Sequence, residues 1–255
     1  MWSAALRRTG NGAAMRINGL SYEPIVVSMT LSPALVPWIN SAWQGSPTRM
    51  SGTLTALDAQ ATSIAGHLAF TDALITSTRI PDLSSGEKSG GVVVTLTPEF
   101  TKAASASSPA AVQPPVQPIS AFRLAVSGLS NSPVKAIKSF EVQTPLPSES
   151  VSRDYARTAV TPVFTDVFVI LDERSATDWI AWYKDFVING NSLASNERTF
   201  TLDLMNASSS TPIASVKAYG VGIVSLRANP AANVHGSLIA ELYVRRMELV
   251  TTGNK

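Results

Sequence analysis

Residues 49–58 read Arg-Met-Ser-Gly-Thr-Leu-Thr-Ala-Leu-Asp, and residues 197–206 read Glu-Arg-Thr-Phe-Thr-Leu-Asp-Leu-Met-Asn. In both stretches apolar side chains alternate with polar or small ones, and both end on a residue that favours turns. When one stretch is laid over the other, Asp58 and Asn206 fall at equivalent positions, 148 residues apart. The sequence therefore predicts two divergent copies of one β-rich unit.

A second alternating run follows each of these stretches. Residues 64–76 begin Ile-Ala-Gly-His-Leu-Ala-Phe, and residues 213–225 begin Ile-Ala-Ser-Val-Lys-Ala-Tyr. Each copy then closes with a further run, at residues 91–97 in the first copy and 237–243 in the second. Alternation of this kind predicts half-buried strands at all four places.

The opening of each copy is predicted to be a hairpin. Alternating runs lie at residues 15–20 and 25–31 in the first copy, and at residues 122–129 and 134–142 in the second. In both copies a Gly-Leu pair closes the first run and supplies a turn.

One helix is predicted in each copy after the opening strands. In the second copy Ser175 is the expected N-cap and Gly190 the expected stop. In the first copy the helix is expected to start at Pro37 and to end before Gly45. Apolar side chains at helical spacing could line a ligand groove, but such a stripe is typical of a helix packed on a sheet. The stripes consist of Trp38, Ile39, Ala42 and Trp43 in the first copy, and Trp179, Trp182, Tyr183, Phe186 and Val187 in the second.

The stretch AASASSPAAVQPPVQP, residues 103–118, separates the two copies. It is uncharged and rich in Pro, Ala and Ser, which indicates a semi-extended connector. The predicted organisation is a first domain at residues 1–103, a linker at 104–118 and a second domain at 119–255. The second domain carries an extra loop at residues 143–161, and long loops in compact domains are usually functional or disordered.

Composition limits the kinds of protein that fit. Of the 255 residues 45% are hydrophobic and 15% charged, which is enough apolar material for a sizeable core. Cysteine is absent, so disulfides and thiolate sites are excluded. A net charge of +2 with scattered Lys and Arg does not indicate a nucleic-acid binder. The longest apolar runs, such as residues 163–171, are too short for a membrane-spanning helix, which needs about 20 residues.

No residue is predicted to act in catalysis, to bind a cofactor or to ligate a metal. His67 falls in an expected strand and His235 in an expected loop, and no Gly-x-Ser-x-Gly or phosphate-binding loop accompanies them. Helix-capping or solvent-exposed roles are expected for Asp166, Asp172 and Glu173. We therefore expect that the protein is not an enzyme.

Two other local patterns also have structural interpretations. The Gly-Val-Gly sequence at residues 220–222 matches no complete nucleotide-binding motif and indicates a kink in a strand. The adjacent Arg245 and Arg246 are expected to be solvated charges on a strand.

A pattern of turn and core residues recurs through both copies. A Trp-bearing helix precedes a segment like Arg-x-x-Gly-Thr-Leu-x-x-Leu-Asp, then a strand with a small–aromatic pair, then a strand with Glu and Leu. The residues that carry the pattern are Arg49, Gly52, Thr53, Leu54, Leu57, Asp58, Ala69, Phe70, Pro81, Asp82 and Leu83, and Arg198, Thr201, Leu202, Asn206, Ala218 and Tyr219. With these, residues 14–102 and 119–250 resemble the tail-tube family of bacteriophages and contractile injection systems, which includes the hemolysin-coregulated tube protein.

The resemblance implies a mainly β fold with one helix per domain, in two tandem copies of a tail-tube-like β-sandwich or barrel domain. In that family, sheets of neighbouring domains join edge to edge around a ring of six, and the rings stack into a tube. Three two-domain chains would complete a pseudo-six-fold ring as a homotrimer, and closure would pair the exposed sheet edges. The implied function is a structural conduit for DNA or protein, with DNA passing through the lumen without specific binding.

The resemblance also implies partners and a location. The chain would assemble with itself and contact sheath or baseplate proteins, without a cofactor, in a virion tail assembled in the cytoplasm of a bacterial host. Loop 143–161 would suit contact between rings or between tube and sheath. The linker, extended at about 3.3 Å per residue, would reach roughly 50 Å between adjacent domains.

Two alternatives remain open at this point. A baseplate hub or tube-initiator ring would also use paired tube domains, present in three copies per particle. A tandem β-sandwich binding module would instead show clustered, exposed aromatic side chains, whereas here Trp and Tyr fall mainly at core-like helical positions.

Overall fold

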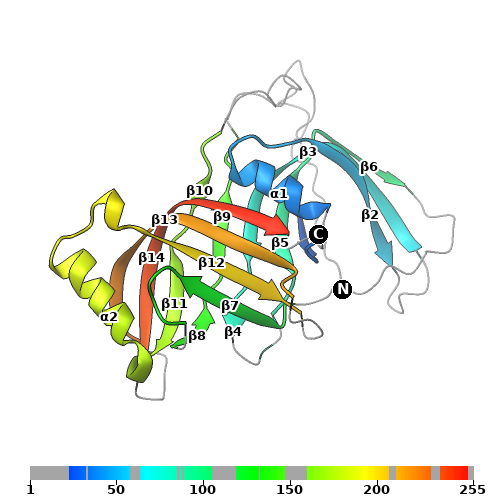
Figure 1. Ribbon diagram of the computed structural model, residues 1–255. Helices are drawn as coiled ribbons and strands as arrows, with labels where there is room; N and C mark the ends of the chain where they lie inside the picture. Colours follow the sequence, from blue (N-terminus) through cyan, green and yellow to red (C-terminus); the bar gives the residue numbers. More distant parts are fainter. Residues whose placement is uncertain are drawn as a thin grey trace.

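The fold of the chain was obtained as a computed structural model (Figure 1). It describes residues 23–32, 34–57, 64–84, 87, 89–104, 119–131, 133–146, 160–206, 211–230 and 236–251. Within these residues the protein is mainly β, as predicted, with antiparallel strand pairing and two α-helices. We call residues 23–104 the first half and residues 119–251 the second half.

The first half has one helix among six strands. The helix follows the first strand, and the predicted strands at 64–76 and 91–97 are both present. The elements are β1 (Ile25–Met29), α1 (Leu35–Trp43), β2 (Met50–Leu57), β3 (Ile64–Ile80), β4 (Leu83–Ser84), β5 (Val92–Thr97) and β6 (Phe100–Ala104). Strand β6 ends inside the predicted linker, whose residues 105–118 lie outside the described part.

The second half has more strands before its helix. Its strands are β7 (Ala121–Val126), β8 (Val134–Ile137), β9 (Phe140–Gln143), β10 (Val163–Phe164), β11 (Val167–Asp172), β12 (Arg198–Met205), β13 (Ala214–Ala228) and β14 (Ser237–Thr251). Its helical segments are a 3-10 turn (Glu173–Ser175), α2 (Thr177–Tyr183), a π-turn η3 (Lys184–Ile188) and a 3-10 turn η4 (Ala194–Asn196).

The strands form two seven-stranded antiparallel sheets. The first runs β1-β5-β3-β9-β10, with β2 and β6 on either side of the other end of the long strand β3. The second runs β4-β8-β11-β14-β13-β12-β7 and curls into a nearly closed barrel, since its end strands β4 and β7 lie against each other. The strongly curved second sheet occupies the centre of Figure 1.

Each half contributes strands to the sheet of the other. Strand β4 of the first half pairs with β8. Strand β9 of the second half pairs with the C-terminal end of β3, from Ser77 to Ile80. The two halves are therefore joined by backbone hydrogen bonds. The domain boundaries at residues 103 and 119 stay a prediction.

The strands around each helix follow one order. In the first half a strand, a helix and three strands form the row β1-β5-β3-β2, and in the second half the row is β11-β14-β13-β12. The register also agrees: Gly52 pairs with Phe70 in the first half, and Phe200 pairs with Ala218, each 148 positions later, in the second. The predicted overlay of residues 49–58 on 197–206 agrees with this register. The predicted overlay of residues 64–76 on 213–225 is wrong by one residue, because it sets Phe70 on Tyr219, whereas the pairing sets it on Ala218.

Irregularities in the two long strands fall at matching places. Asp72 in β3 has φ +50°, and Gly220 in β13, 148 positions later, has φ +63°. The register of β3 shifts between Ile75 and Ser77, and that of β13 shifts between residues 223 and 225. Only glycine adopts positive φ without strain, so Gly220 suits its place, and the predicted kink at residues 220–222 is confirmed.

The predicted opening hairpins are wrong in one case and outside the described residues in the other. Residues 134–142 are divided into β8 and β9, and β7 pairs with β12 while β8 pairs with β11. The reason is local: the Trp179 indole donates to the Ser130 carbonyl, and the Ser130 amide donates to Asp178, so the connection is drawn across to the helix. In the first half, residues 15–20 lie outside the described part.

Helix α1 begins at Leu35, two residues before the predicted start, with Pro37 still in its first turn. The residue before α2 is Ala176 and not Ser175, which lies in the preceding 3-10 turn where Asp172 accepts from the Arg174 amide. The predicted glycine stops are confirmed, because Gly45 and Gly190 have φ +72° and +73° just after the helices. The stripe residues of α1 are buried, as are Trp179, Trp182 and Phe186.

Candidate assembly surfaces

One of the two histidines, His67, lies in the described part of the chain, on β3. The Nδ1 atom of His67 lies 3.1 Å from the Thr55 hydroxyl, its cross-strand neighbour in the β2–β3 pair. This is the strand position that the sequence predicts. His235 lies outside the described residues. Among the residues described, no group of three or more His, Cys, Asp or Glu side chains could hold a metal ion.

The carboxylates singled out in the sequence have structural partners. Asp172 accepts a hydrogen bond from the Arg174 amide and lies 3.0 Å from the Lys135 amine. The hydrogen bonds from Lys135 and from Arg174 lower the pKa of Asp172 to about 2. Glu173 donates its backbone amide to the Gly236 carbonyl, which ties the turn to the start of β14. Asp172 therefore acts as a cap, one of the roles expected for these residues.

Arg245 and Arg246 are exposed, as predicted, but each is also held by partners. The guanidinium of Arg245 lies 2.7 Å from the Glu197 carboxylate, which also accepts from the Tyr243 hydroxyl. Burial raises the pKa of Glu197, but these two hydrogen bonds outweigh it and leave that pKa lowered. Arg246 stacks 4.2 Å from the centre of the Tyr219 ring. Both guanidinium groups are therefore held by neighbouring side chains, on opposite faces of β14.

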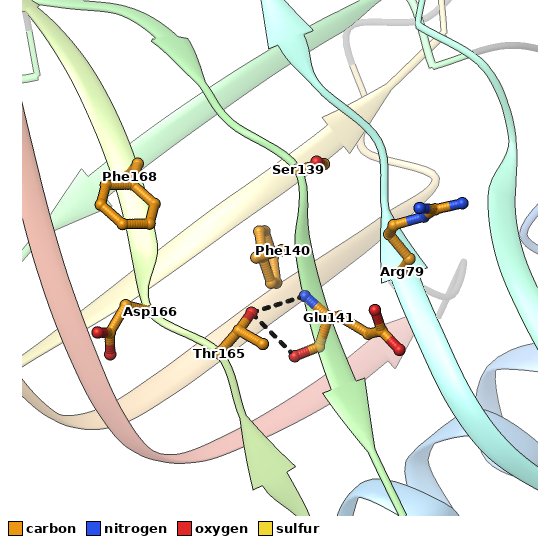
Figure 2. Close-up of a pocket in the computed structure, with 7 residues that line it drawn as sticks. All are labelled: Arg79, Ser139, Phe140, Glu141, Thr165, Asp166 and Phe168. Carbon is orange, nitrogen blue, oxygen red and sulfur yellow. Dashed lines mark hydrogen bonds between the residues drawn. The ribbon is translucent and has the colours of Figure 1, made fainter.

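An open groove crosses the outer face of the first sheet and reaches the second. One part has a volume of about 430 Å³, and a part of about 220 Å³ continues from it across β1 and β5. Figure 2 shows how Thr165 bonds both the amide and the carbonyl of Glu141, between the Asp166 and Glu141 carboxylates. The groove is lined by Arg79, Ser139, Phe140, Glu141, Thr165, Asp166 and Phe168, and by Val26, Ser77, Val93 and Thr95.

The groove face carries two matching pairs of Ser and Glu. The Ser77 hydroxyl donates to Glu141 at 2.6 Å, and the Ser225 hydroxyl, 148 positions later, donates to Glu241 at 2.7 Å. Glu241 pairs across strands with a groove residue, Phe168, so it lies on the same face. Burial, together with the charge of Glu241, raises the pKa of Asp166. The face is thus polar and slightly acidic, and its shallow, open shape does not enclose a small ligand.

Several strand edges have no second strand partner among the described residues. Strand β6 pairs only with β3 and β7 only with β12, while β1 pairs only with β5. An edge exposes backbone amides and carbonyls that another strand or chain can pair with. Edge strands of this kind bound any sheet that does not close completely into a barrel.

The two helix ends differ in how they are covered. Counted back from the terminal glycine, Trp43 and Ile188 hold the same place, two residues before Gly45 and Gly190. Trp43 is fully buried, whereas Ile188 is 65% exposed. In Figure 1 α1 lies against the end of β14, while α2 lies at the outer margin of the second sheet.

Apolar side chains at the end of α2 form a small patch that the sequence did not reveal. We call Val187, Ile188 and Leu193 the α2 patch; Val187 is 37% and Leu193 70% exposed. Helical spacing placed Val187 on the core face, but the π-turn adds a residue to the last turn and rotates the residues that follow. Leu193 could have indicated this patch in the sequence, because it is the one large apolar residue in the polar stretch 189–197.

Comparison with known proteins adds no family. A scan against models of protein families finds none that matches the chain, and a search of curated proteins finds no sequence that matches it. None of the helices in the described ranges is long and apolar enough to cross a membrane. The fold itself defines the class: a mainly antiparallel β protein with two sheets and a helix beside each.

Proposed function

We propose that this chain is a structural subunit of a phage tail tube, or of a related injection machine, built from two tandem tube-like domains. The observation that carries the proposal is the constant register of the two halves. The β2–β3 pairing recurs in β12–β13 148 positions later, with the positive-φ residue at the corresponding place. Local propensity does not fix where a bulge falls, so duplication of one unit accounts for the match most simply.

The contact between the halves supports assembly into rings. The first half contributes α1 and the edge of β3, whereas the second contributes β14 and β9. Because the two surfaces differ, repeating this contact between like units gives a ring or a filament and never a closed pair. Three chains supply six such units, which is the basis for a homotrimeric ring with pseudo-six-fold symmetry.

In this proposal the groove face lines the conduit. It spans strands of both halves, and its charged side chains are Glu141, Asp166 and Glu241 against Arg79 and Arg227. A slightly acidic wall repels the phosphates of DNA, so cargo could slide without being held. A basic wall would bind phosphates and resist transport.

The remaining parts of the proposal concern contacts beyond the ring. Loop 143–161, of which residues 147–159 lie outside the described part, would contact the next ring, the sheath or the baseplate. The protein would then act in the virion tail after assembly in the cytoplasm of the bacterial host. Deletion of residues 147–159 is expected to leave rings intact and to prevent their stacking; normal stacking would refute this role.

The experiment that tests the function is negative-stain electron microscopy of the purified protein over a wide range of concentrations. Rings or tubes with three-fold or pseudo-six-fold views are expected. Tubes of variable length would indicate a polymerising tube protein, and single rings would indicate the hub or initiator. Monomers at every concentration would contradict the proposal.

The binding-module alternative has less support. Exposed aromatic side chains on one surface would favour it, but among the described residues Phe100 is the one exposed aromatic. The other exposed large apolar residues are aliphatic or Met and lie on strands, on the π-turn and on the loop that follows it.

A further inference from the structure

We infer that the α2 patch is the docking surface for a second copy of this chain, and that it seats on the β6 edge of that copy. The inference rests on the proposed function, which it makes specific to one pair of surfaces. Its basis is the contact between the two halves within one chain, which serves as a template for the contact between chains.

The template is the covered end of α1. The side-chain oxygen of Asn40 accepts a hydrogen bond from the backbone amide of Leu249 on β14, at 3.1 Å. The Val160 amide donates to the Gly45 carbonyl at 3.0 Å, and the Thr144 hydroxyl to the Ala42 carbonyl at 3.3 Å. All three donors belong to the second half. The second half therefore covers the end of the first helix and donates to one of its last carbonyls, that of Ala42.

The corresponding end of α2 lacks this cover. Trp43 is fully buried and Ile188 is 65% exposed, although each lies two residues before its terminal glycine. Ala42 is 1% exposed, whereas Val187, at the matching place, is 37% exposed. Exposed aliphatic residues grouped at one helix end mark a contact surface when the matching end is buried in an interface.

The partner surface follows from the register. On β14, residues 246–250 pair with residues 215–219 of β13. On β6, residues 100–104 pair with residues 67–71 of β3, each 148 positions earlier than its β13 counterpart. Strand β6 is therefore the first-half equivalent of the part of β14 that receives α1. Ala103 holds the place of Leu249, and its side chain is exposed.

The same contact, repeated between chains, places α2 of one chain on β6 of the next. The chain would then use one type of contact six times around the ring: three times within chains, through α1 and β14, and three times between chains, through α2 and β6. This requires no new kind of surface, and it covers both the patch and an edge that has one strand partner among the described residues.

The first test is a charge in the patch. Ile188→Asp should raise the protein concentration needed for half-maximal ring formation by about tenfold or more, because an unpaired carboxylate would be buried at the contact. Sedimentation velocity would resolve monomers and trimers, and circular dichroism would verify the fold. Val26→Asp is the matched control, since Val26 is 50% exposed but lies in the groove; it should assemble as the wild type does.

The second test is a crosslink, which the natural absence of cysteine makes clean. A chain with Ile188→Cys and Ala103→Cys, treated with a short thiol-to-thiol crosslinker, should give covalent dimers and trimers on a denaturing gel. A chain with Val26→Cys and Ala103→Cys should remain monomeric on that gel.

The outcomes separate this inference from the proposed function. If the wild type forms rings but Ile188→Asp assembles equally well and the first cysteine pair gives no covalent trimer, the contact lies elsewhere and the inference is overturned while the proposed function stands. If the wild type forms no ring at any concentration, both fall.

Discussion

The two halves of the molecule share a backbone plan but differ in the ion pair that bridges the start of their hairpins. Arg49 pairs with Glu99 in the first half, and Glu197 pairs with Arg245 in the second. Glu197 comes 148 positions after Arg49, and Arg245 comes 146 positions after Glu99, so the same bridge is built with its charges exchanged. Attraction between opposite charges does not depend on which side carries which sign. The comparison teaches that an ion pair at this place can be built with either arrangement of its charges.

The bridges lie beside the two matching bulges. The Arg49 guanidinium donates to the Asp72 carbonyl, and the Arg245 side chain lies against Gly220. The first bridge is mostly buried on both sides, whereas Arg245 is largely exposed. We expect the first bridge to contribute more to stability, because solvent screens exposed pairs.

The largest expected difference between the halves lies at the helix ends. Trp43→Ala removes a fully buried side chain and should lower the free energy of unfolding by about 3–5 kcal/mol. Ile188→Ala removes an exposed one and should change it by less than about 0.5 kcal/mol in the monomer. Urea unfolding at low protein concentration measures both. Equal losses of unfolding free energy would mean that the end of α2 is covered within the chain, as the end of α1 is, and would contradict the difference in exposure between Trp43 and Ile188.

Exchange of the charges sharpens the comparison next. Arg49→Glu alone opposes two carboxylates and should cost about 1–3 kcal/mol of unfolding free energy. Adding Glu99→Arg restores the polarity used in the second half and should recover most of that loss. Unfolding of the two single variants and the double variant gives the coupling free energy. Additive losses, without recovery, would show that the bridge depends on residue identity.

The bulge positions should respond to substitution in opposite ways. At Gly220 a Cβ atom would lie 2.8 Å from the Arg245 Cδ atom, and φ is positive, so Gly220→Ala should cost about 1–2 kcal/mol. Asp72→Gly relieves positive φ while it loosens the unfolded chain, so the net change should stay within roughly 0.5 kcal/mol. Thermal unfolding of the two variants decides this. A loss at residue 72 as large as that at residue 220 would contradict the equivalence of the bulges.

Much of the strand framework could be predicted from sequence, because alternation is a local property. The overlay of residues 64–76 on 213–225 comes close but is wrong by one residue, because Phe70 lies opposite Gly52 whereas Ala218, not Tyr219, lies opposite Phe200. The choice of partner strands could not be predicted. Residues 134–142 were predicted to form one strand. The Lys138 amide instead donates to the Phe168 carbonyl and the Ser139 amide to the Asp82 carboxylate, so the strand is interrupted there and the chain passes from one sheet to the other.

The candidate surfaces were less accessible to sequence reasoning. The groove face is assembled from strands far apart in the chain, and no local pattern brings Arg79 near Thr165. The α2 patch could not be predicted for another reason. A regular helix would bury Val187, and no sequence pattern predicts the π-turn that exposes it. The charge-exchanged bridge was also missed, since its partners are 50 residues apart in the first half.

The smallest expected effect compares the strands that precede the two helices. Val167 pairs with Leu242 as Ile25 pairs with Leu96, so Asp172 and Thr30 hold the same place, five residues further along. Only the second half has a carboxylate there. Hydrogen bonds from Lys135 and Arg174 lower the pKa of Asp172 from 3.8 to about 2, so the folded state favours the charged form of this carboxylate.

Asp172 therefore stabilises the fold above pH 4, and this contribution should be lost progressively as the pH falls from about 4 to about 2. Asp172→Asn, which can still accept the Arg174 amide, should lower the melting temperature slightly at pH 7, and its deficit should shrink over that interval. Melting curves of both proteins between pH 2 and pH 7 provide the measurement, with Glu173→Gln as the control for losing one negative charge from the same turn. A deficit that stays constant down to pH 2 would show that the Asn variant perturbs packing, and that the hydrogen bonds and ion pair of Asp172 do not favour its charged form in the folded state.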